Sequence, residues 1–171
     1  KVSFTNLAAS SRDIMKIKED IEIPANKPNI GRVLWDQVNF SEIESRATDV
    51  GVHISGKMDI FVIYKPDDEV APVQYVSATR EFQDTVNCDG IDEDMILDDM
   101  ITASRGSVSV RANDGGEDRI LQVESSLNVD IKVYEDVEAD LLKDMFSYSA
   151  QVDPVRSRFS YENLLMRNNA K

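Results

Sequence analysis

Few side chains in this sequence could act as a nucleophile, an imidazole base or a metal ligand. His53 is the only histidine, so any catalytic triad or zinc site built on imidazole would need it. It stands between Val52 and Ile54 in an alternating stretch, which predicts an exposed position on a strand. Cys88, the only cysteine, adjoins Asp89 and no basic residue, so we expect a packing residue and not a reactive thiolate.

Two acidic segments raise the question of a calcium site. The segment CDGIDEDMILDD holds enough carboxylates for one ion: Asp89, Asp92, Glu93, Asp94, Asp98 and Asp99. Their spacing does not fit the EF-hand loop, because Gly90 comes too early and no glutamate closes the series. NDGGED, residues 113–118, has the composition that a tight turn demands with or without an ion. We interpret both segments as solvated loops, and calcium binding stays open.

The sequence contains no motif of a known catalytic or cofactor site. It has no G-x-S-x-G, no phosphate-binding glycine loop and no dinucleotide fingerprint. Carboxylate pairs arise by chance among 32 acidic residues, so they do not nominate a glycosidase site. We therefore expect a protein that is not an enzyme and that needs no metal or cofactor. A hydrolase that uses His53, or a close carboxylate pair, is the enzymatic alternative.

The charge balance narrows the classes of partner. With 32 acidic against 19 basic residues the net charge is −13, which repels nucleic-acid phosphates and anionic lipid surfaces. Such a charge would attract basic proteins or divalent cations, although it commonly serves solubility alone. No apolar run approaches the ~18 residues of a membrane span, and one cysteine allows no internal disulfide. We expect neither nucleic-acid binding nor membrane insertion.

The first half of the chain alternates between apolar and polar residues like a β-sheet. Residues 15–23 predict a half-buried strand, and residues 50–64 repeat the pattern more clearly. Residues 38–48 alternate less cleanly, which favours a strand near a sheet edge. The segment KPDDEVAP, residues 65–72, has turn chemistry and separates 50–64 from a further strand at 73–86. These two strands predict an antiparallel hairpin.

Two prolines and the only tryptophan interrupt this pattern. Pro24 would end the first strand, and Pro28 sets the backbone before Asn29, whose side chain can cap a helix. Apolar residues then recur at helical spacing: Ile30, Val33 and Leu34, with Trp35 adjoining. We predict a short helix over 29–37 whose apolar face, with Leu34 and Trp35, covers one end of the core. The functional alternative is that the two prolines form a binding loop.

The second half of the chain predicts further strands. Residues 95–103 and 107–112 read as two strands, with a bend or bulge at Gly106 between them. The turn at 113–118 favours a tight hairpin into residues 121–133. That last stretch alternates over 13 residues without a change of phase, which suits a central strand of a twisted antiparallel sheet.

The end of the chain predicts one more element, and the complete set of predicted elements indicates the fold class. Apolar residues three or four apart favour a second short helix over 136–146. The fold class expected is mainly β, an antiparallel β-sandwich or partly open barrel with two short helices. We expect one domain over 1–150 and a C-terminal extension or linker to a following module over 151–171.

Several segments, taken in order, resemble the SPOCS domain. They are DIMKIKEDIEI, then PANKPNIGRVLWDQV, then HISGKMDIFVIYKPDDEVAPVQYV, and finally SSLNVDIKVYEDVEADLLKDMFS, together reaching from about Asp13 to Phe146. The family pattern has an entry of the type IP…KPDI, a long strand ending in an acidic turn, and a late strand leading into an acidic stretch. This sequence departs from it with Asn29, Ile30 and Gly31 and with Trp35.

The resemblance implies a function and a cellular location. SPOCS domains occur in one or more copies, often with a C-terminal LysM module, in proteins of spore-forming Firmicutes. It implies a non-enzymatic protein-interaction or scaffold module of a spore-coat or cell-envelope protein, joined to sister domains in a longer chain. The expected partner is another protein, such as a spore coat morphogenetic protein. The expected location is intracellular, on the mother-cell side of the spore surface or coat, with the cell envelope as alternative.

Six residues are the candidate partner-binding site: Asp67, Asp68, Glu69, Pro24, Pro28 and Trp35. We expect loss of folding when Pro28, Leu34 or Trp35 is replaced, because these residues are predicted to lie at the end of the core. Substitution in the acidic turn should alter binding and leave the fold intact. The alternative function is a carbohydrate- or peptidoglycan-binding β module of a LysM-containing protein. It would need a platform of aromatic side chains, which the sequence spreads along the chain: Trp35, Tyr64, Tyr75, Tyr134, Tyr148 and Tyr161.

Overall fold

The computed structural model describes residues 1–140 together with 148, 151, 155, 158 and 160. Seven strands make up the fold: β1 (Val2–Glu22), β2 (Ile30–Thr48), β3 (Gly51–Pro66), β4 (Gln74–Asn87), β5 (Ile96–Ala103), β6 (Ser107–Ala112) and β7 (Asp118–Ala139). Within the described part no helix is present, and so none that is long and apolar enough to span a membrane. The mainly β class predicted from alternation is confirmed.

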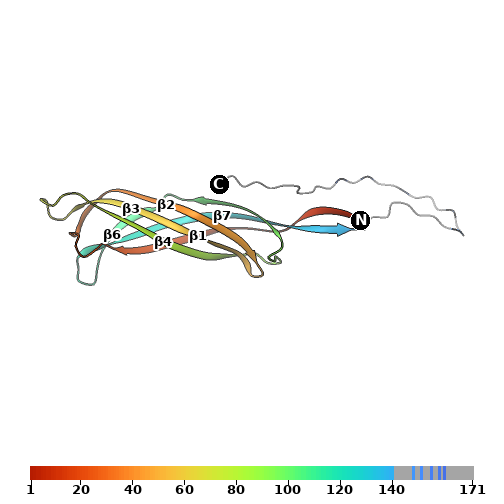
Figure 1. Cartoon of the computed structure of the whole chain (residues 1–171), viewed down its shortest axis with the longest axis horizontal. Coiled ribbons are helices and arrows are strands. Elements are labelled where there is room, and N and C mark those ends of the chain that lie inside the picture. The colour runs from red at the N-terminus through yellow and green to blue at the C-terminus, as the bar shows by residue number, and fades with distance from the viewer. Residues whose placement is uncertain (141–147, 149–150, 152–154, 156–157, 159, 161–171) are drawn as a thin grey trace.

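The strands form two antiparallel sheets that pack face to face (Figure 1). Sheet A has the order β1-β7-β5, and β6 pairs with β7 beyond the end of β5. Sheet B has the order β2-β3-β4. The sheets do not close on each other, so the architecture is a sandwich and not a closed barrel. The predicted hairpin of 50–64 with 73–86, the turn at 113–118 and the central position of 121–133 are all confirmed.

The core lies between the central strands of the two sheets. β3 turns its even-numbered residues inward, and six of them are at most 2% exposed: Val52, Ile54, Met58, Ile60, Val62 and Tyr64. β7 turns its odd-numbered residues inward, including Leu121, Val123, Leu127, Ile131 and Val133, all fully buried. Since β-strand side chains alternate between faces, an unbroken phase over such lengths commits one whole face of each strand to the core.

Two connections cross between the sheets and close the ends of the core. At one end the β1–β2 loop, residues 23–29, passes over Tyr64, whose buried hydroxyl donates a 3.0 Å hydrogen bond to the Pro28 carbonyl. At the other end the β4–β5 loop, residues 88–95, inserts Cys88 and Ile91, which are 5% and 6% exposed. The predicted packing role of Cys88 is confirmed. Burial and the adjoining Asp89 raise the pKa of its thiol.

The helix predicted over 29–37 is wrong, because this segment is the start of β2. Ile30 and Val33 both face the core although they are three residues apart, and the sheet achieves this with register shifts against β3 between Ile30 and Arg32 and between Val33 and Trp35. Each bulge adds a residue to one strand and moves the later side chains to the opposite face. The bulges in β2 therefore place core-facing residues three apart in the sequence, which is the spacing that a helix would also give.

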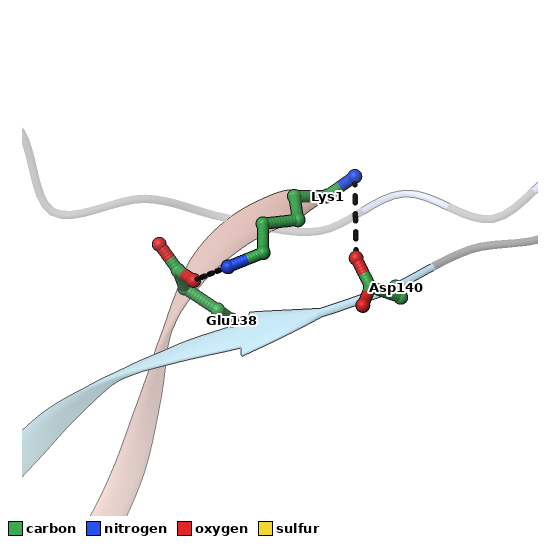
Figure 2. Close-up of polar contacts among 3 residues, drawn as sticks. All are labelled: Lys1, Glu138 and Asp140. Carbon is green, nitrogen blue, oxygen red and sulfur yellow. Dashed lines mark hydrogen bonds and ion pairs between the residues drawn. The ribbon is translucent and has the colours of Figure 1, made fainter.

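The second predicted helix, over 136–146, is also not supported. Residues 136–139 continue β7 and pair with the start of β1, and residues 141–146 lie outside the described residues. The end of β7 and the start of β1 project from the sandwich as a two-stranded ribbon (Figure 1). At its tip Lys1 Nζ lies 2.8 Å from a Glu138 oxygen, and the amino group of Lys1 lies 3.5 Å from Asp140 (Figure 2). The domain boundary predicted at 150 and 151 stays a prediction.

The break predicted at Gly106 is confirmed, since it separates β5 from β6. A Cβ atom on Gly106 would lie 2.7 Å from the Val38 Cβ of β2. The glycine thus lets the edge of sheet A approach sheet B at the break between β5 and β6.

Candidate functional site

The outer face of sheet B carries a row of exposed apolar side chains near the β1–β2 loop. Trp35, Ile63 and Tyr75 are register partners across β2, β3 and β4, so they form one row over the width of the sheet. Trp35 is 47% exposed and Tyr75 is 58% exposed. Leu34 and Val73 are exposed at the same end of these strands. Contiguous exposed apolar side chains of this kind mark interaction surfaces more often than single ones do.

Phe61 joins the two outer aromatic residues of this row into one cluster. Its ring centroid is 5.9 Å from that of Trp35 in an edge arrangement and 5.7 Å from that of Tyr75 in a stacked arrangement. We call Trp35, Phe61, Ile63 and Tyr75 the ring row. The ammonium of Lys27 lies 4.5 Å from the centre of the Tyr75 ring and donates a 2.5 Å hydrogen bond to the Tyr75 carbonyl. The cluster is therefore ordered by contacts among its own rings and by a cation–π interaction.

The β1–β2 loop places Lys27, and Arg119 at the start of β7 holds that loop in position. The loop turns through a 2.9 Å hydrogen bond from Lys27 N to the Pro24 carbonyl. The Arg119 guanidinium donates to four acceptors on the loop, at 2.8 to 3.3 Å: the carbonyls of Ile23, Pro24 and Lys27, and Asn29 Oδ1. Pro24 and Pro28 therefore belong to a fixed crossing between the sheets. Whether that loop also binds a partner stays a prediction.

The predicted acidic turn lies at the same end of the sandwich and joins β3 to β4. Asp67, Asp68 and Glu69 are all exposed, and Val70 after them is 92% exposed. Asp68 shapes the turn, because its carboxylate accepts a 3.0 Å hydrogen bond from the backbone N–H of Val70. The backbone N–H of Asp67 donates to the Asn29 carbonyl at 3.2 Å, which fixes the turn against the β1–β2 loop.

These contacts bring five of the six predicted site residues to one end of the molecule, with Trp35 on the adjoining face. Phe61 and Ile63 were not predicted as site residues, although alternation assigned both to the face opposite the buried residues of β3. The available signal was that the polar face of 50–64 turns apolar near its end. The structure also corrects the expectation that the aromatic residues are spread along the chain, since Trp35 and Tyr75 are gathered beside Phe61.

Trp35 is a surface residue, so the expected loss of folding on its replacement is revised. We now expect Trp35→Ala to lower the free energy of unfolding by about 1 kcal/mol, through lost contact with Phe61. Urea unfolding followed by circular dichroism measures this change. Leu34, 44% exposed, gives the matched variant Leu34→Ala, for which we expect a similarly small loss. A cooperative transition lost entirely in either variant would contradict this placement.

Asp59 lies beyond the ring row on the same face and has a lowered pKa. Its carboxylate accepts hydrogen bonds from Ser41 Oγ at 2.7 Å and Thr79 Oγ1 at 2.8 Å, and these two bonds depress the pKa below the ordinary 3.8. A lowered pKa in the folded state stabilises the fold above the unfolded pKa, and this stability is lost as the pH falls through the folded pKa.

We expect a carbon-detected NMR titration of Asp59 to give a midpoint below 3.8. In a variant combining Ser41→Ala and Thr79→Ala, the midpoint should move up toward that ordinary value, because both hydroxyl donors are gone. Lys57→Gln is the control, since Lys57 is only the last and weakest cause of the shift. An unchanged midpoint in the double variant would assign the shift to another cause.

His53 lies half-buried on the outer face of sheet B, at the end opposite the ring row. Its Nδ1 is 3.4 Å from Thr85 Oγ1. The predicted strand position facing away from the core is confirmed, although the side chain is less exposed than expected. Among the described residues, no group of three or more His, Cys, Asp and Glu side chains could hold a metal ion.

Two surface hollows lie away from the predicted site. One of about 520 Å³ adjoins the β2 bulge at Glu42, whose φ is 50°, and there a 2.6 Å ion pair with Glu42 raises the pKa of Lys57. The other, of about 620 Å³, lies on the outer face of sheet A beside exposed Ile14 and Met100. Both are open on one side.

The fold and this surface define a β-sandwich module with an exposed apolar and charged patch at one end. Residues 29–110 match the family described as SipL, SPOCS domain. This match, from β2 into β6, confirms the resemblance to the SPOCS domain family. It supports a sporulation-associated domain. The quoted motifs in 13–23 and 125–147 lie outside the matched residues. Neither curated proteins nor solved structures gave a match to the chain.

Proposed function

We propose that the chain is a non-enzymatic protein-interaction module of a sporulation protein, and that it binds its partner with the ring-row end of sheet B. The observation that carries the proposal is the ring row itself, an ordered apolar surface on the outer face of sheet B in which Trp35 and Tyr75 remain about half exposed. Loops and exposed faces held by a rigid scaffold commonly carry binding. The acidic turn and the β1–β2 loop border this surface and supply polar contacts at its rim.

The family match supports the sporulation part of the proposal. We propose a spore-coat or cell-envelope protein as the parent chain, with sister domains or a LysM module joined to this one. The partner proposed is another protein of the coat, such as a morphogenetic protein, on the mother-cell side of the spore surface. These assignments follow from the family and carry no geometric argument of their own.

The carbohydrate- or peptidoglycan-binding alternative has one observation in its favour, the clustering of aromatic residues on a sheet face. Sugars stack on open ring faces, however, and the Tyr75 ring is already in contact with other side chains. Tyr75 has Phe61 stacked on one side and the Lys27 ammonium over its ring. We therefore favour a protein partner. Binding of the chain to a glycan array, abolished by Trp35→Ala and Tyr75→Ala, would instead support the alternative.

A quantitative pull-down from lysate of sporulating cells tests the proposal. We expect recovery of the partner to fall by at least ~10-fold when Trp35 and Tyr75 are both replaced by alanine, because central aromatic residues dominate interface energies. The triple variant Asp67→Asn, Asp68→Asn, Glu69→Gln should also change recovery. Asp92→Asn, Glu93→Gln, Asp94→Asn is the matched control, since it removes the same charge at the opposite end of the sandwich.

Each variant must first show the unfolding transition of the parent chain. Recovery that is unchanged in both the aromatic and the acidic-turn variants would overturn the proposed surface. If recovery falls equally in the acidic-turn variant and in its distal control, recovery depends on the net charge of the chain and not on the position of the acidic residues.

A further inference from the structure

Two cations stand side by side next to the ring row without an acidic partner. Arg32 of β2 and Lys65 of β3 are register partners, and both are exposed. Within residues 1–140 neither forms an ion pair, although the chain has 32 acidic residues. Directly opposite positions of an antiparallel pair bring Cβ atoms to within about 5 Å, where like charges destabilise the sheet. The stability of the fold does not explain this pair.

Several other basic residues of the sheets behave differently, although Lys16, Arg46 and Lys132 also lack an ion pair within the described residues. Five cationic side chains pair with carboxylates across strands: Arg12 with Asp130, Lys18 with Glu124, Lys57 with Glu42, Arg80 with Glu19 and Arg111 with Asp20. Arg32 and Lys65 thus form a local positive site on a protein of net charge −13. Their charge is available to an anionic group from outside the chain.

The cation pair and the ring row form one surface. Lys65 and Ile63 are two residues apart on β3 and share a face, so they are separated by about 7 Å along the strand. Arg32 precedes Trp35 on β2, and a register shift between them turns Trp35 onto the same outer face. The row of cations therefore borders the row of rings, and beyond the cations lies the acidic turn 67–69.

We propose that Arg32, Lys65 and the ring row bind a segment of a partner protein in which a carboxylate side chain adjoins an apolar side chain. The carboxylate lies over Arg32 and Lys65, and the apolar side chain packs against Trp35 and Ile63. This inference rests on the proposed function and adds the chemistry of the partner.

A single carboxylate fits this surface better than a polyanion does. The net charge of −13 and the acidic turn repel a nucleic acid or an anionic membrane, which present many charges over a wide area. Salt screens exposed charges beyond about 8 to 10 Å, so one carboxylate in direct contact with two cations is attracted while more distant acids weigh little. An arginine and a lysine together can surround both carboxylate oxygens.

Trp35 is the only tryptophan, so its fluorescence reports on this surface directly. The probe is a short capped peptide with one glutamate flanked by leucines, titrated into the whole chain. We expect a saturable change in Trp35 emission that weakens as salt is raised. The double variant Arg32→Gln, Lys65→Gln should raise the apparent Kd by at least ~10-fold, because both direct charge contacts are removed.

Arg46→Gln with Lys16→Gln is the matched control. It removes two exposed cations that form no ion pair within residues 1–140, one at the far end of the same sheet face and one on sheet A. We expect its Kd to stay within ~2-fold of the parent chain. A peptide with lysine in place of glutamate should not produce the saturable change that Arg32 and Lys65 control.

Three outcomes overturn the inference. They are an unchanged Kd in the Arg32 and Lys65 variant, an equal loss in the control variant, and a saturable response to a peptidoglycan fragment with none to the acidic peptide. The lysate experiment separates this inference from the proposed function. If recovery of the partner requires Trp35 and Tyr75 but not Arg32 and Lys65, the proposed interaction surface is supported. The inference that the partner contributes a carboxylate is then wrong.

Discussion

Replacing Arg119 by methionine should lower the free energy of unfolding by about 2 to 4 kcal/mol, because one guanidinium satisfies four acceptors on the β1–β2 loop. Hydrogen bonds to charged groups contribute more than neutral ones, and methionine keeps much of the packing volume. The loop also covers Tyr64 at the end of the core, so its release should expose that ring. Urea unfolding of both proteins measures the loss.

Two control variants test whether the loss of stability comes from the several N–H donors of the Arg119 guanidinium. Arg111→Met removes an arginine whose ion pair with Asp20 is exposed, so it should cost less than about 1 kcal/mol. Arg119→Lys keeps the charge but cannot reach four acceptors from one ammonium, so most of the loss should remain. Full rescue by lysine would show that charge alone holds the loop.

Loop release should also be visible in the titration of Tyr64. Burial raises the pKa of its hydroxyl above 10.0, while Arg119 acts in the opposite sense. A raised folded pKa stabilises the fold below the unfolded pKa, and that contribution is lost as the pH rises through the folded value. If Arg119→Met opens the loop, the solvent reaches the hydroxyl and the pKa of Tyr64 should move back toward 10.0.

Alternation predicted most of the fold because β3, β4 and β7 pair without register shifts over long stretches. β3 and β4 stay in register from Gly51 to Tyr64, and β1 and β7 do so from Ala9 to Glu22. Where two strands pair without a register shift, every second residue along the sequence faces the core. The buried residues can then be predicted directly from the alternation.

The prediction failed where the phase changes. In β2 three register shifts interrupt the pairing with β3, and the segment around Val33 and Leu34 acquires helical spacing without a helix. Gly31 was one overlooked sign, because a Cβ there would lie 2.7 Å from the Pro66 carbonyl oxygen. Close approach of two backbones is a reason for glycine at a strand, and a helix gives no such reason.

The candidate site could be predicted only in part, for a related reason. The acidic turn and the prolines were visible as local composition, and the loop contacts that join them were not. The ring row needs residues 35, 63 and 75 to be in register, which depends on the bulge before Trp35 and on the pairing of three strands. Sequence periodicity does not fix such pairing.

The core prediction with the largest expected effect concerns Leu127, at the middle of β7. Leu127→Ala should lower the free energy of unfolding by about 3 to 4 kcal/mol, because its side chain is fully buried between the two sheets and its loss leaves a cavity. Its register partners are Met15 of β1 and Ala103 of β5, the two strands that flank β7. Because these strands are hydrogen-bonded to β7, they have little freedom to move into the cavity.

Ile14→Ala is the matched control for this cavity, since it also truncates an aliphatic side chain in sheet A. Ile14 is 56% exposed on the outer face, one residue out of phase with buried Met15, so its truncation should cost less than about 1 kcal/mol. Leu127→Met keeps the volume and should cost less than about 1.5 kcal/mol. Equal losses for Leu127→Ala and Ile14→Ala would mean that the two faces of sheet A are buried alike, which would contradict a sandwich with one core.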